Sequence, residues 1–401
     1  MAEQKPAAPG TRLGVLVMNQ IAASGLCRLP AETYHVGKDV ADPAAILLRS
    51  ADLHGFAIPA SVRAIGRAGA GTNNVPVDLM SQRGVPVFNA PGANANAVKE
   101  LVLAGMLLAA RQIAPALRFV ATLDVHAPGL EQRIEHGKKA FAGYELAGQT
   151  LGVIGLGKIG CLVADAAIKL GMQVLGFDPE ITVDAAWSLP SQVRRAASVN
   201  DVLKQSQFVS LHVPLLDATR HLVNAANIGL MRPGAVLLNF SREGVVSDSA
   251  VLDSFEAGHL GQYVGDFPGA VLHGHPQVVA LPHLGASTRE AEENCAVMVV
   301  DQLRDYLENG NVANAVNFPP VSMPRESAFR VAIANANVPN MLGQISTAMA
   351  QAGLNIHNMV NKSRGGMAYT LVDVDSAVTP EVQAGIAAIH GVLAVRYLPA
   401  A

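Results

Sequence analysis

A glycine-rich turn near the middle of the chain limits the possible folds more than any other feature. An apolar run, 151–154, leads into three glycines spaced G-x-G-x-x-G, Gly155, Gly157 and Gly160, and an Ala- and Leu-rich stretch, 161–170, follows. This order predicts a buried strand, a tight turn and a helix. The first glycine permits the turn, the second lets a pyrophosphate approach the backbone, and the third lets helix and strand pack closely. The helix N-terminus would then bind the pyrophosphate through its free N–H groups.

An acidic residue follows where a dinucleotide site needs one. A second apolar segment, 173–177, ends at Asp178, about 20 positions beyond the glycines. A carboxylate there can accept both hydrogen bonds from an adenosine ribose and would repel the phosphate of NADP. Pro179 occupies the place where an NADP-specific arginine would stand. The sequence therefore predicts NAD as the cofactor, and a purely structural strand–helix turn is the alternative.

Composition and charge exclude several classes of protein. The net charge of −3 gives no electrostatic basis for binding nucleic acid or an acidic membrane surface. The longest apolar run, 101–110, is about half the length needed to cross a bilayer, and the first ten residues lack the apolar core of a signal peptide. Cys27, Cys161 and Cys295 lie far apart, which predicts buried free thiols in a reducing compartment and no metal site. We expect a cytoplasmic protein.

Alternating strands and helices predict an α/β fold with two doubly wound, Rossmann-like domains. In the first domain, strands are expected at 13–18, 45–48, 62–66 and 85–89. A long helix, 96–122, would cross into the second domain, where strands are expected at 151–155, 173–177, 208–212, 235–239, 262–265 and 277–281. Another helix, 285–308, could cross back. The dinucleotide domain, 96–283, would then be inserted into a substrate domain made of 1–95 and 284–310.

The end of the chain predicts a third, smaller domain. Residues 311–326 are rich in Pro and Asn and indicate a linker. The order after it is strand, helix, strand, strand, helix, strand, which predicts a ferredoxin-like βαββαβ domain over 327–401. The expected elements are 328–335, 339–352, 354–361, 367–374, 379–389 and 391–398.

Two residues at the ends of predicted strands carry the chemistry. Arg242 follows the strand at 235–239, and its planar guanidinium suits a carboxylate in bidentate fashion. His283 comes just after the strand at 277–281, and an imidazole can take a hydroxyl proton while a hydride leaves the same carbon. The alternatives are a surface arginine and a structural histidine.

These motifs together resemble a known family. The glycine triplet, Asp178, His212-Val-Pro214, Asn239-x-Ser-Arg242 and Pro282-His-Leu-Gly-Ala-Ser-Thr288 are similar to the D-isomer-specific 2-hydroxyacid dehydrogenases. Within that family the chain resembles the branch that acts on D-3-phosphoglycerate, through 66–71, 89–94 and 286–294. Its last part resembles an ACT domain, through 337–342 and 353–356. The resemblance covers roughly residues 12–398 and implies oxidation of D-3-phosphoglycerate to 3-phosphohydroxypyruvate, the first step of L-serine biosynthesis.

The resemblance also implies a role for each matching residue. Arg242 would bind the substrate carboxylate and polarise the C2 oxygen, and His283 would be the acid/base. The residues in contact with NAD would be Gly155, Gly157, Lys158, Ile159, Gly160, Asp178, Pro214, Phe240, Ser241, Arg242, Asp266, His283 and Gly285. Arg49, Ser50, Arg67 and Asn94 would face the substrate. Lys138 and Lys139 are candidates for its phosphate, although they could equally belong to a solvated surface.

One position departs from the family pattern. A glutamate usually supports the catalytic histidine shortly after an Asp-x-Phe strand end, and here that position is Ala270. Either Asp266 also supports His283, or the histidine works without a carboxylate partner. Without one, the imidazolium is less stabilised and its pKa is expected to be lower than in relatives that have the glutamate.

The ACT-like domain adds a regulatory expectation. Such domains pair edge to edge and bind amino acids at the interface, and the resemblance places Asn335, Asn337 and Asn355 at the effector positions. An asparagine both donates and accepts hydrogen bonds, which suits a zwitterionic amino acid. We therefore expect feedback inhibition by L-serine, with a domain that only assembles oligomers as the alternative. The family implies a homodimer or a homotetramer.

Two other functions are open from the sequence. The enzyme could act on another 2-hydroxyacid, such as 2-hydroxyglutarate or glyoxylate and hydroxypyruvate. The chain could instead be a non-catalytic, NAD-sensing regulator, an idea that Ala270 favours and that Arg242, His283 and the ACT-like domain oppose.

Overall fold

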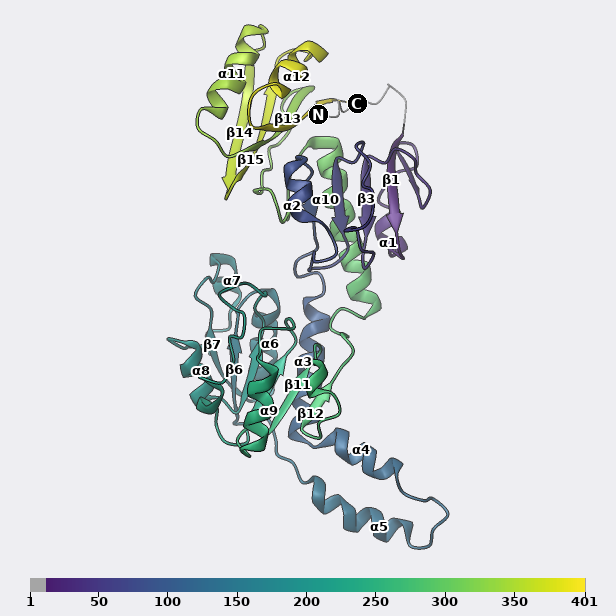
Figure 1. Cartoon of the computed structure of the whole chain (residues 1–401), viewed down its shortest axis with the longest axis vertical. Helices are drawn as coiled ribbons and strands as arrows, with labels where there is room; N and C mark the ends of the chain where they lie inside the picture. The colour runs from purple at the N-terminus through teal and green to yellow at the C-terminus, as the bar shows by residue number, and fades with distance from the viewer. Residues whose placement is uncertain (1–11, 401) are drawn as a thin grey trace. The chain divides into compact units, whose positions relative to one another are not determined.

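The computed structural model describes residues 12–400 and divides into two compact units (Figure 1). One unit spans Ala95–Thr288, and the other combines the chain up to Asn94 with the chain from Arg289 onward. One unit is therefore inserted into the other, and the inserted unit is slightly longer than the expected 96–283.

The inserted unit is built on a seven-stranded sheet in which every strand is parallel to its neighbours. The strand order is β12-β11-β10-β9-β6-β7-β8, so the direction of winding reverses between β6 and β9. This confirms the doubly wound fold, and such a reversal is where ligands bind. The strands are β6 (Thr150–Ile154), β7 (Gln173–Phe177), β8 (Arg194–Arg195), β9 (Phe208–Leu211), β10 (Val236–Asn239), β11 (Gln262–Gly265) and β12 (Val278–Ala280). The helical elements are α6 (Lys158–Lys169), α7 (Val183–Ser188), α8 (Val199–Gln205), α9 (Asp248–Glu256), η2 (Ile228–Leu230) and η3 (Ala270–Leu272).

Both faces of this sheet are buried, because a parallel sheet is covered by its crossover helices. In β6, Leu151 and Val153 belong to one apolar core, whereas Ile154 belongs to the other. The alternation continues in β10, where Leu238 and Leu237 face opposite sides. The short edge strand β8 was not expected from the sequence, because two exposed arginines give no apolar signal.

The helix expected over 96–122 is wrong as a single element. The structure has α3 (Ala95–Ala110) and α4 (Ile113–Ala121), bent by 67° around Gln112, which adopts a left-handed φ of 50°. Pro115 explains the break, since proline fits the first turn of a new helix but not the interior of a continuous one. No single described helix is long and apolar enough to cross a membrane, and only the bent pair α3 and α4 passes that test together.

The hairpin after α3 stands away from the sheet of its unit (Figure 1). It contains α4, α5 (Leu130–Gly137) and η1 (Lys138–Phe141), and none of these three elements buries a residue. Its apolar side chains, such as Leu117 and Val120, are largely exposed.

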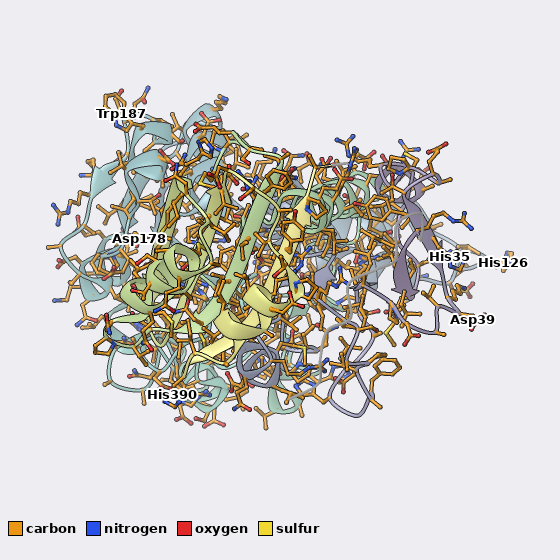
Figure 2. All side chains as sticks on the ribbon, turned by 90° about the horizontal axis from the view of Figure 1, so that it is seen from above. His35, Asp39, His126, Asp178, Trp187 and His390 are labelled. Atoms are coloured by element: carbon orange, nitrogen blue, oxygen red, sulfur yellow. The ribbon has the colours of Figure 1, made fainter. Side chains whose placement is uncertain are left out.

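The other unit begins with a five-stranded parallel sheet in the order β2-β1-β3-β4-β5. The strands are β1 (Leu13–Met18), β2 (Tyr34–Gly37), β3 (Ala45–Leu48), β4 (Ala64–Arg67) and β5 (Val87–Phe88), and the helices are α1 (Ala23–Leu26), α2 (Val77–Gln82) and α10 (Arg289–Asn309). Helix α10 packs so tightly on β4 that a Cβ at Gly66 would lie 2.5 Å from Leu303 Cδ1. Edge strand β2 was not expected, because it is half exposed and has a polar side chain, His35 (Figure 2).

The C-terminal domain is ferredoxin-like, as expected. Its antiparallel sheet has the order β14-β15-β13-β16. The elements are β13 (Phe329–Ala336), α11 (Met341–Gln351), β14 (Ile356–Arg364), β15 (Met367–Val374), α12 (Pro380–Ala387) and β16 (Val392–Pro399). One sheet face packs under α11 and α12, and the other joins the core around α10.

The C-terminal domain also caps the end of α10. The last carbonyls of a helix have no partner within the helix. Here Arg396 donates to the carbonyls of Tyr306 and Leu307, Arg330 to that of Asn309, and Tyr369 to that of Gly310. The expected linker is packed rather than solvated, with Phe318 and Val321 fully buried in the same core.

Candidate active site

The glycine turn between β6 and α6 has the geometry that a dinucleotide needs. Gly155 has a φ of +92°, and a Cβ there would lie 2.5 Å from the carbonyl oxygen of His212. A Cβ at Gly160 would lie 2.0 Å from Gly155 O, so helix and strand touch through the glycines. At Gly157, by contrast, a Cβ would meet no protein atom within 4 Å. Gly157 is therefore not required by packing, and the space beside it is open to a ligand.

The N-terminus of α6 is ready for an anion. Gly157 is its N-cap and provides no side chain to satisfy the first N–H groups. Lys158 is exposed in the first turn, whereas Ile159 packs against the core and orients that turn. Free N–H groups, the positive end of the helix dipole and a lysine together suit a pyrophosphate.

Asp178 is fixed at the end of β7. One carboxylate oxygen accepts from the N–H of Leu156 at 2.8 Å and the other from the N–H of Glu180 at 2.9 Å. The first of these bonds ties Asp178 to the glycine turn. The carboxylate forms no ion pair with the described residues, so its charge is available to a ribose. Figure 2 labels Asp178 together with Trp187, which is 86% exposed on α7.

Arg242 lies on a loop that a buried asparagine organises. Asn239 accepts from the N–H and the hydroxyl of Ser241, and its amide donates to the carbonyl of Arg242 at 3.0 Å and to Tyr263 Oη. Arg242 is half-buried and donates to the Ser241 carbonyl, and it has no ion pair with any described residue. Burial lowers its pKa, but a guanidinium stays charged at neutral pH. Asn239 belongs to the Asn-x-Ser-Arg motif, but this role was not predicted from the sequence. Its position two residues before the Ser-Arg pair could have suggested it.

The loop of His283 is held by Asp266. Both oxygens of this buried carboxylate accept backbone N–H groups, from Leu284 at 2.7 Å and from Gly285 at 2.6 Å. His283 itself is exposed, has a left-handed φ of 53°, and its ring lies 4.5 Å from the ring of Phe267. Asp266 therefore positions the backbone that carries His283. Ala270 lies exposed at the start of η3 and brings no carboxylate to this loop.

Other residues expected at the cofactor lie at the same edge. Phe240 and Ser241 follow β10 and are buried, and Pro214 follows β9 in a turn closed by Thr219. His212 belongs to the His-Val-Pro motif, but no role was predicted for it. Its Nδ1 is buried and has no hydrogen-bond partner among the described residues, although part of the residue reaches the surface. Burial lowers the pKa of His212 to about 4.

The cations expected to bind substrate lie in the other unit, also at the carboxyl edge of a parallel sheet. Arg49 and Ser50 follow β3, and Arg67 ends the neighbouring strand β4. Arg49 forms an ion pair with Glu292 at 2.6 Å, a partner that the sequence did not suggest. Asn94 lies just before α3 with a buried Oδ1 that accepts no hydrogen bond from the described residues.

Lys138 and Lys139, the candidates for the substrate phosphate, lie far from the loop of Arg242 within one chain. Helix α3 begins beside Gly285 at the carboxyl edge of the sheet and ends at Ala110 near the opposite edge, where the Ala110 carbonyl accepts from the N–H of Tyr144. Both lysines lie on the hairpin beyond that opposite edge, and Lys138 pairs with Glu135. The sequence does not show in which direction a hairpin points, so this separation within one chain could not be predicted.

The three asparagines expected to bind an effector are not close together within one chain. Asn337 donates to the carbonyl of Gly365, at one end of the sheet, and Asn335 is buried next to it in β13. Asn355 precedes β14 at the other end, where its N–H donates to Asp375. Six residues of β15 separate the two ends, about 20 Å.

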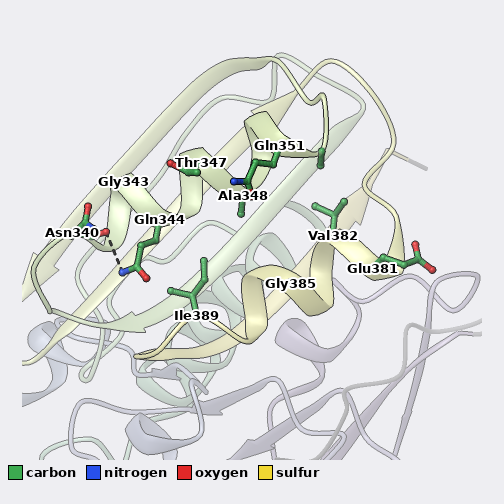
Figure 3. Close-up of a pocket in the computed structure, with 11 residues that line it drawn as sticks. Asn340, Gly343, Gln344, Thr347, Ala348, Gln351, Glu381, Val382, Gly385 and Ile389 are labelled. Atoms are coloured by element: carbon green, nitrogen blue, oxygen red, sulfur yellow. Dashed lines mark hydrogen bonds between the residues drawn. The ribbon is translucent and has the colours of Figure 1, made fainter.

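A groove of about 660 Å³ lies between α11 and α12 (Figure 3). Its lining mixes polar side chains, such as Gln344 and Glu381, with apolar ones, such as Val382 and Ile389. Gln344 donates to the carbonyl of Asn340, the N-cap of α11. The groove contains neither Asn335 nor Asn355.

The thiols differ from expectation in one case. Cys161 and Cys295 are buried as expected, but Cys27 is exposed. The described residues contain no cluster of three potential metal ligands.

Known proteins resemble both the inserted unit and most of the whole chain. The NAD-binding domain of the D-isomer specific 2-hydroxyacid dehydrogenases matches residues 103–285. A D-3-phosphoglycerate dehydrogenase of Escherichia coli K12 is 33% identical over 348 residues, 84% of this chain and 81% of that protein. One from Haemophilus influenzae is 32% identical over 347 residues, again 84% and 81%.

A solved structure shares the fold. The NAD⁺-bound 3-phosphoglycerate dehydrogenase of Entamoeba histolytica aligns with a TM-score of 0.60 and 22% identity, covering 76% of this chain and 99% of that one. The open space at Gly157 and the fixed carboxylate of Asp178 fit NAD. The chain therefore belongs to the D-isomer-specific 2-hydroxyacid dehydrogenase family and is an oxidoreductase with an NAD-binding domain.

Proposed function

We propose that the protein oxidises D-3-phosphoglycerate at C2 to 3-phosphohydroxypyruvate. The observation that carries this proposal is the 33% identity to a D-3-phosphoglycerate dehydrogenase over 84% of the chain. It is supported by two functional groups, Arg242 and His283, on loops that follow strands of the same parallel sheet.

Each residue has one task in this reaction. Arg242 binds the substrate carboxylate and stabilises the charge that develops on the C2 oxygen. His283 takes the proton of the C2 hydroxyl, and the C2 hydrogen leaves as a hydride. NAD supplies the hydride acceptor when bound. Asp178 and the N-terminus of α6 bind the ribose and the pyrophosphate, and Asp266 positions the loop of His283.

Further contacts with the substrate's anionic groups are proposed from residues outside the loop of Arg242. Arg49, Ser50, Arg67 and Asn94 are the proposed contacts in the first sheet. Lys138 and Lys139 can contribute only from a second copy of the chain, because their own hairpin points away from Arg242. The exposed apolar side chains of α4, among them Leu117 and Val120, supply a surface for such a copy.

We further infer that the C-terminal domain is an ACT domain that binds L-serine between two copies. In an antiparallel pairing of two β14 edges, residues at the start of one strand lie beside the end of the other. Asn355 would then approach the Gly365 turn of the second copy, to which Asn337 is hydrogen-bonded. Asn335, which is buried in β13 on the inner side of β15, would support that turn.

The test is NADH formation from D-3-phosphoglycerate, with and without L-serine, using Arg242→Ala as the control. We expect turnover that serine reduces and that the control abolishes. Turnover without a serine effect would support the proposed reaction and would mean that the C-terminal domain serves only to assemble oligomers. Turnover of 2-hydroxyglutarate or hydroxypyruvate instead would change the substrate. NAD binding with no turnover of any of these acids would favour a sensing role.

A further inference from the structure

Arg49 already has an anionic partner within the chain. Its Nη1 lies 2.6 Å from Oε1 of Glu292, which stands in the first turn of α10. The arginine follows β3, so the pair joins the carboxyl edge of the sheet to the helix N-terminus. Both side chains remain partly exposed, 32% for Arg49 and 43% for Glu292, so an anion from solution can reach them.

Both ends of this ion pair are fixed by their surroundings. Asn74 donates to the carbonyl of Arg49 at 3.1 Å and to that of Ala51 at 2.6 Å, which holds the loop after β3. Helix α10 packs closely against β4 at Gly66 and Leu303. The carboxylate therefore stands at a defined place relative to the guanidinium.

The other proposed substrate cation is nearby, because Arg67 in β4 pairs with Leu48, the residue before Arg49. Burial raises the pKa of Cys295, one turn after Glu292 on α10, while the charges of Arg67 and Arg49 act to lower it and that of Glu292 to raise it. The charges of two cations and one carboxylate thus all act on this thiol.

We propose that Glu292 is a positioning residue that occupies the anion position of Arg49 until an anionic substrate displaces it. This inference rests on the proposed function, because it takes Arg49 as a substrate contact. Glu292 aims the guanidinium in the empty protein, and a carboxylate or a phosphate must replace it to bind. An anion therefore binds to Arg49 more weakly than it would if Glu292 carried no charge.

The expected effect is modest, because partly exposed ion pairs are weak and are screened by salt. Glu292→Gln keeps the shape and removes the competing charge. We expect it to lower the Kd for D-3-phosphoglycerate, measured by calorimetry with NADH present, about two- to fivefold at low salt. The ratio of KM values should change more than the ratio of kcat values.

A matched control lies in the same helical turn. Glu293 is also partly exposed, but it pairs with Arg289 rather than with Arg49. Glu293→Gln removes the same charge from the same turn and should leave the Kd within the error of the wild-type value. Adding Glu292→Gln to an Arg49→Met variant should likewise produce no gain. An equal gain in both glutamine variants would show a general charge effect and would overturn the proposal.

The binding readout separates this proposal from the proposed function. Inorganic phosphate serves as a second probe, since its binding needs no turnover. If Glu292→Gln binds phosphate and the acid more tightly but neither protein oxidises the acid, the displacement stands and the substrate assignment fails. If turnover is normal and Glu292→Gln binds no more tightly, or if the wild type binds neither anion, the displacement is refuted.

Discussion

Arg330 and Asp373 form a bidentate ion pair in which both side chains are fully buried, with Nε–Oδ1 at 2.6 Å and Nη2–Oδ2 at 2.8 Å. The pair connects β13 to β15, and the remaining donors of Arg330 bind the carbonyls of Asn309, Met323 and Pro324. One guanidinium therefore ties the C-terminal sheet to the end of α10 and to the segment between them.

Removing one member of this pair should be costly. Asp373→Asn leaves a buried cation without its counter-charge, and we expect a loss of about 3–5 kcal/mol in unfolding free energy. Urea unfolding measures it. The control is Asp165→Asn, which breaks an exposed pair with Lys169 and should cost less than about 1 kcal/mol. Similar losses in the two variants would contradict the structural role of the buried pair.

His212 should make stability depend on pH. Burial lowers its pKa to about 4, so the unfolded chain binds a proton at a higher pH than the folded one. The stabilisation is complete above the unfolded pKa of about 6.5 and is lost as pH falls towards 4, by up to about 3 kcal/mol. We expect the unfolding free energy of His212→Gln, measured by urea unfolding at each pH, to change less between pH 6.5 and 4 than that of the wild type. Parallel curves for the two proteins would refute the assignment.

Two glycines of the same turn should respond differently to alanine. Gly157→Ala adds a Cβ that meets no protein atom, so the Tm should stay close to the wild-type value while NAD binding weakens about tenfold or more. Gly160→Ala places a Cβ 2.0 Å from Gly155 O and should lower the Tm. Calorimetry for NAD and thermal unfolding separate the two effects. Unchanged NAD affinity in Gly157→Ala would show that the pyrophosphate lies elsewhere.

Asn239 should matter for the reaction although it does not touch the substrate. Asn239→Ala releases the loop of Arg242, and a shift of about 1 Å in a reacting group can reduce kcat/KM about 100-fold. Steady-state kinetics with D-3-phosphoglycerate measure it. Gln277→Ala is the control, since it too removes two hydrogen bonds that a side-chain amide donates, here to the carbonyls of Leu260 and Gly261 at the amino edge of the sheet. A normal kcat/KM for Asn239→Ala would mean that Arg242 is held in another way.

Ala270 offers a gain-of-function test. A carboxylate beside an imidazolium stabilises its protonated form, so Ala270→Glu should move the acidic limb of the kcat/KM profile to higher pH. Ala270→Gln has nearly the same shape without the charge and should leave the limb in place. If the glutamate and glutamine variants give the same profile, residue 270 does not act on His283 electrostatically.

The sequence predicted most of the fold because its signals were local. The glycine spacing, the apolar runs of β6, β7 and β9 to β12, and the C-terminal βαββαβ order are all found in the structure. Two edge strands, β2 and β8, were missed because edge strands carry few apolar residues. The break at Gln112 was missed because apolar periodicity continues across it, and only Pro115 signalled it.

The site was predictable where residues follow strands, and less so where contacts join distant segments. Asp178 and Arg242 could be placed from their neighbours. The partner of Arg49 could not, because Glu292 is 243 positions away in the chain and meets it only through the packing of α10. The same holds for Asn239, whose role depends on a loop conformation that residue types alone do not specify.

The capped end of α10 implies that the C-terminal domain is not a separable addition to the chain. Cutting the chain after residue 326 would remove the side-chain donors to the carbonyls of Tyr306, Leu307 and Asn309 and would uncover Phe318 and Val321. The last turn of α10 is therefore completed by the C-terminal domain, and the two behave as one structural element. A shortened chain that lacks the domain would need different residues around this turn to satisfy its carbonyls and cover its apolar side chains.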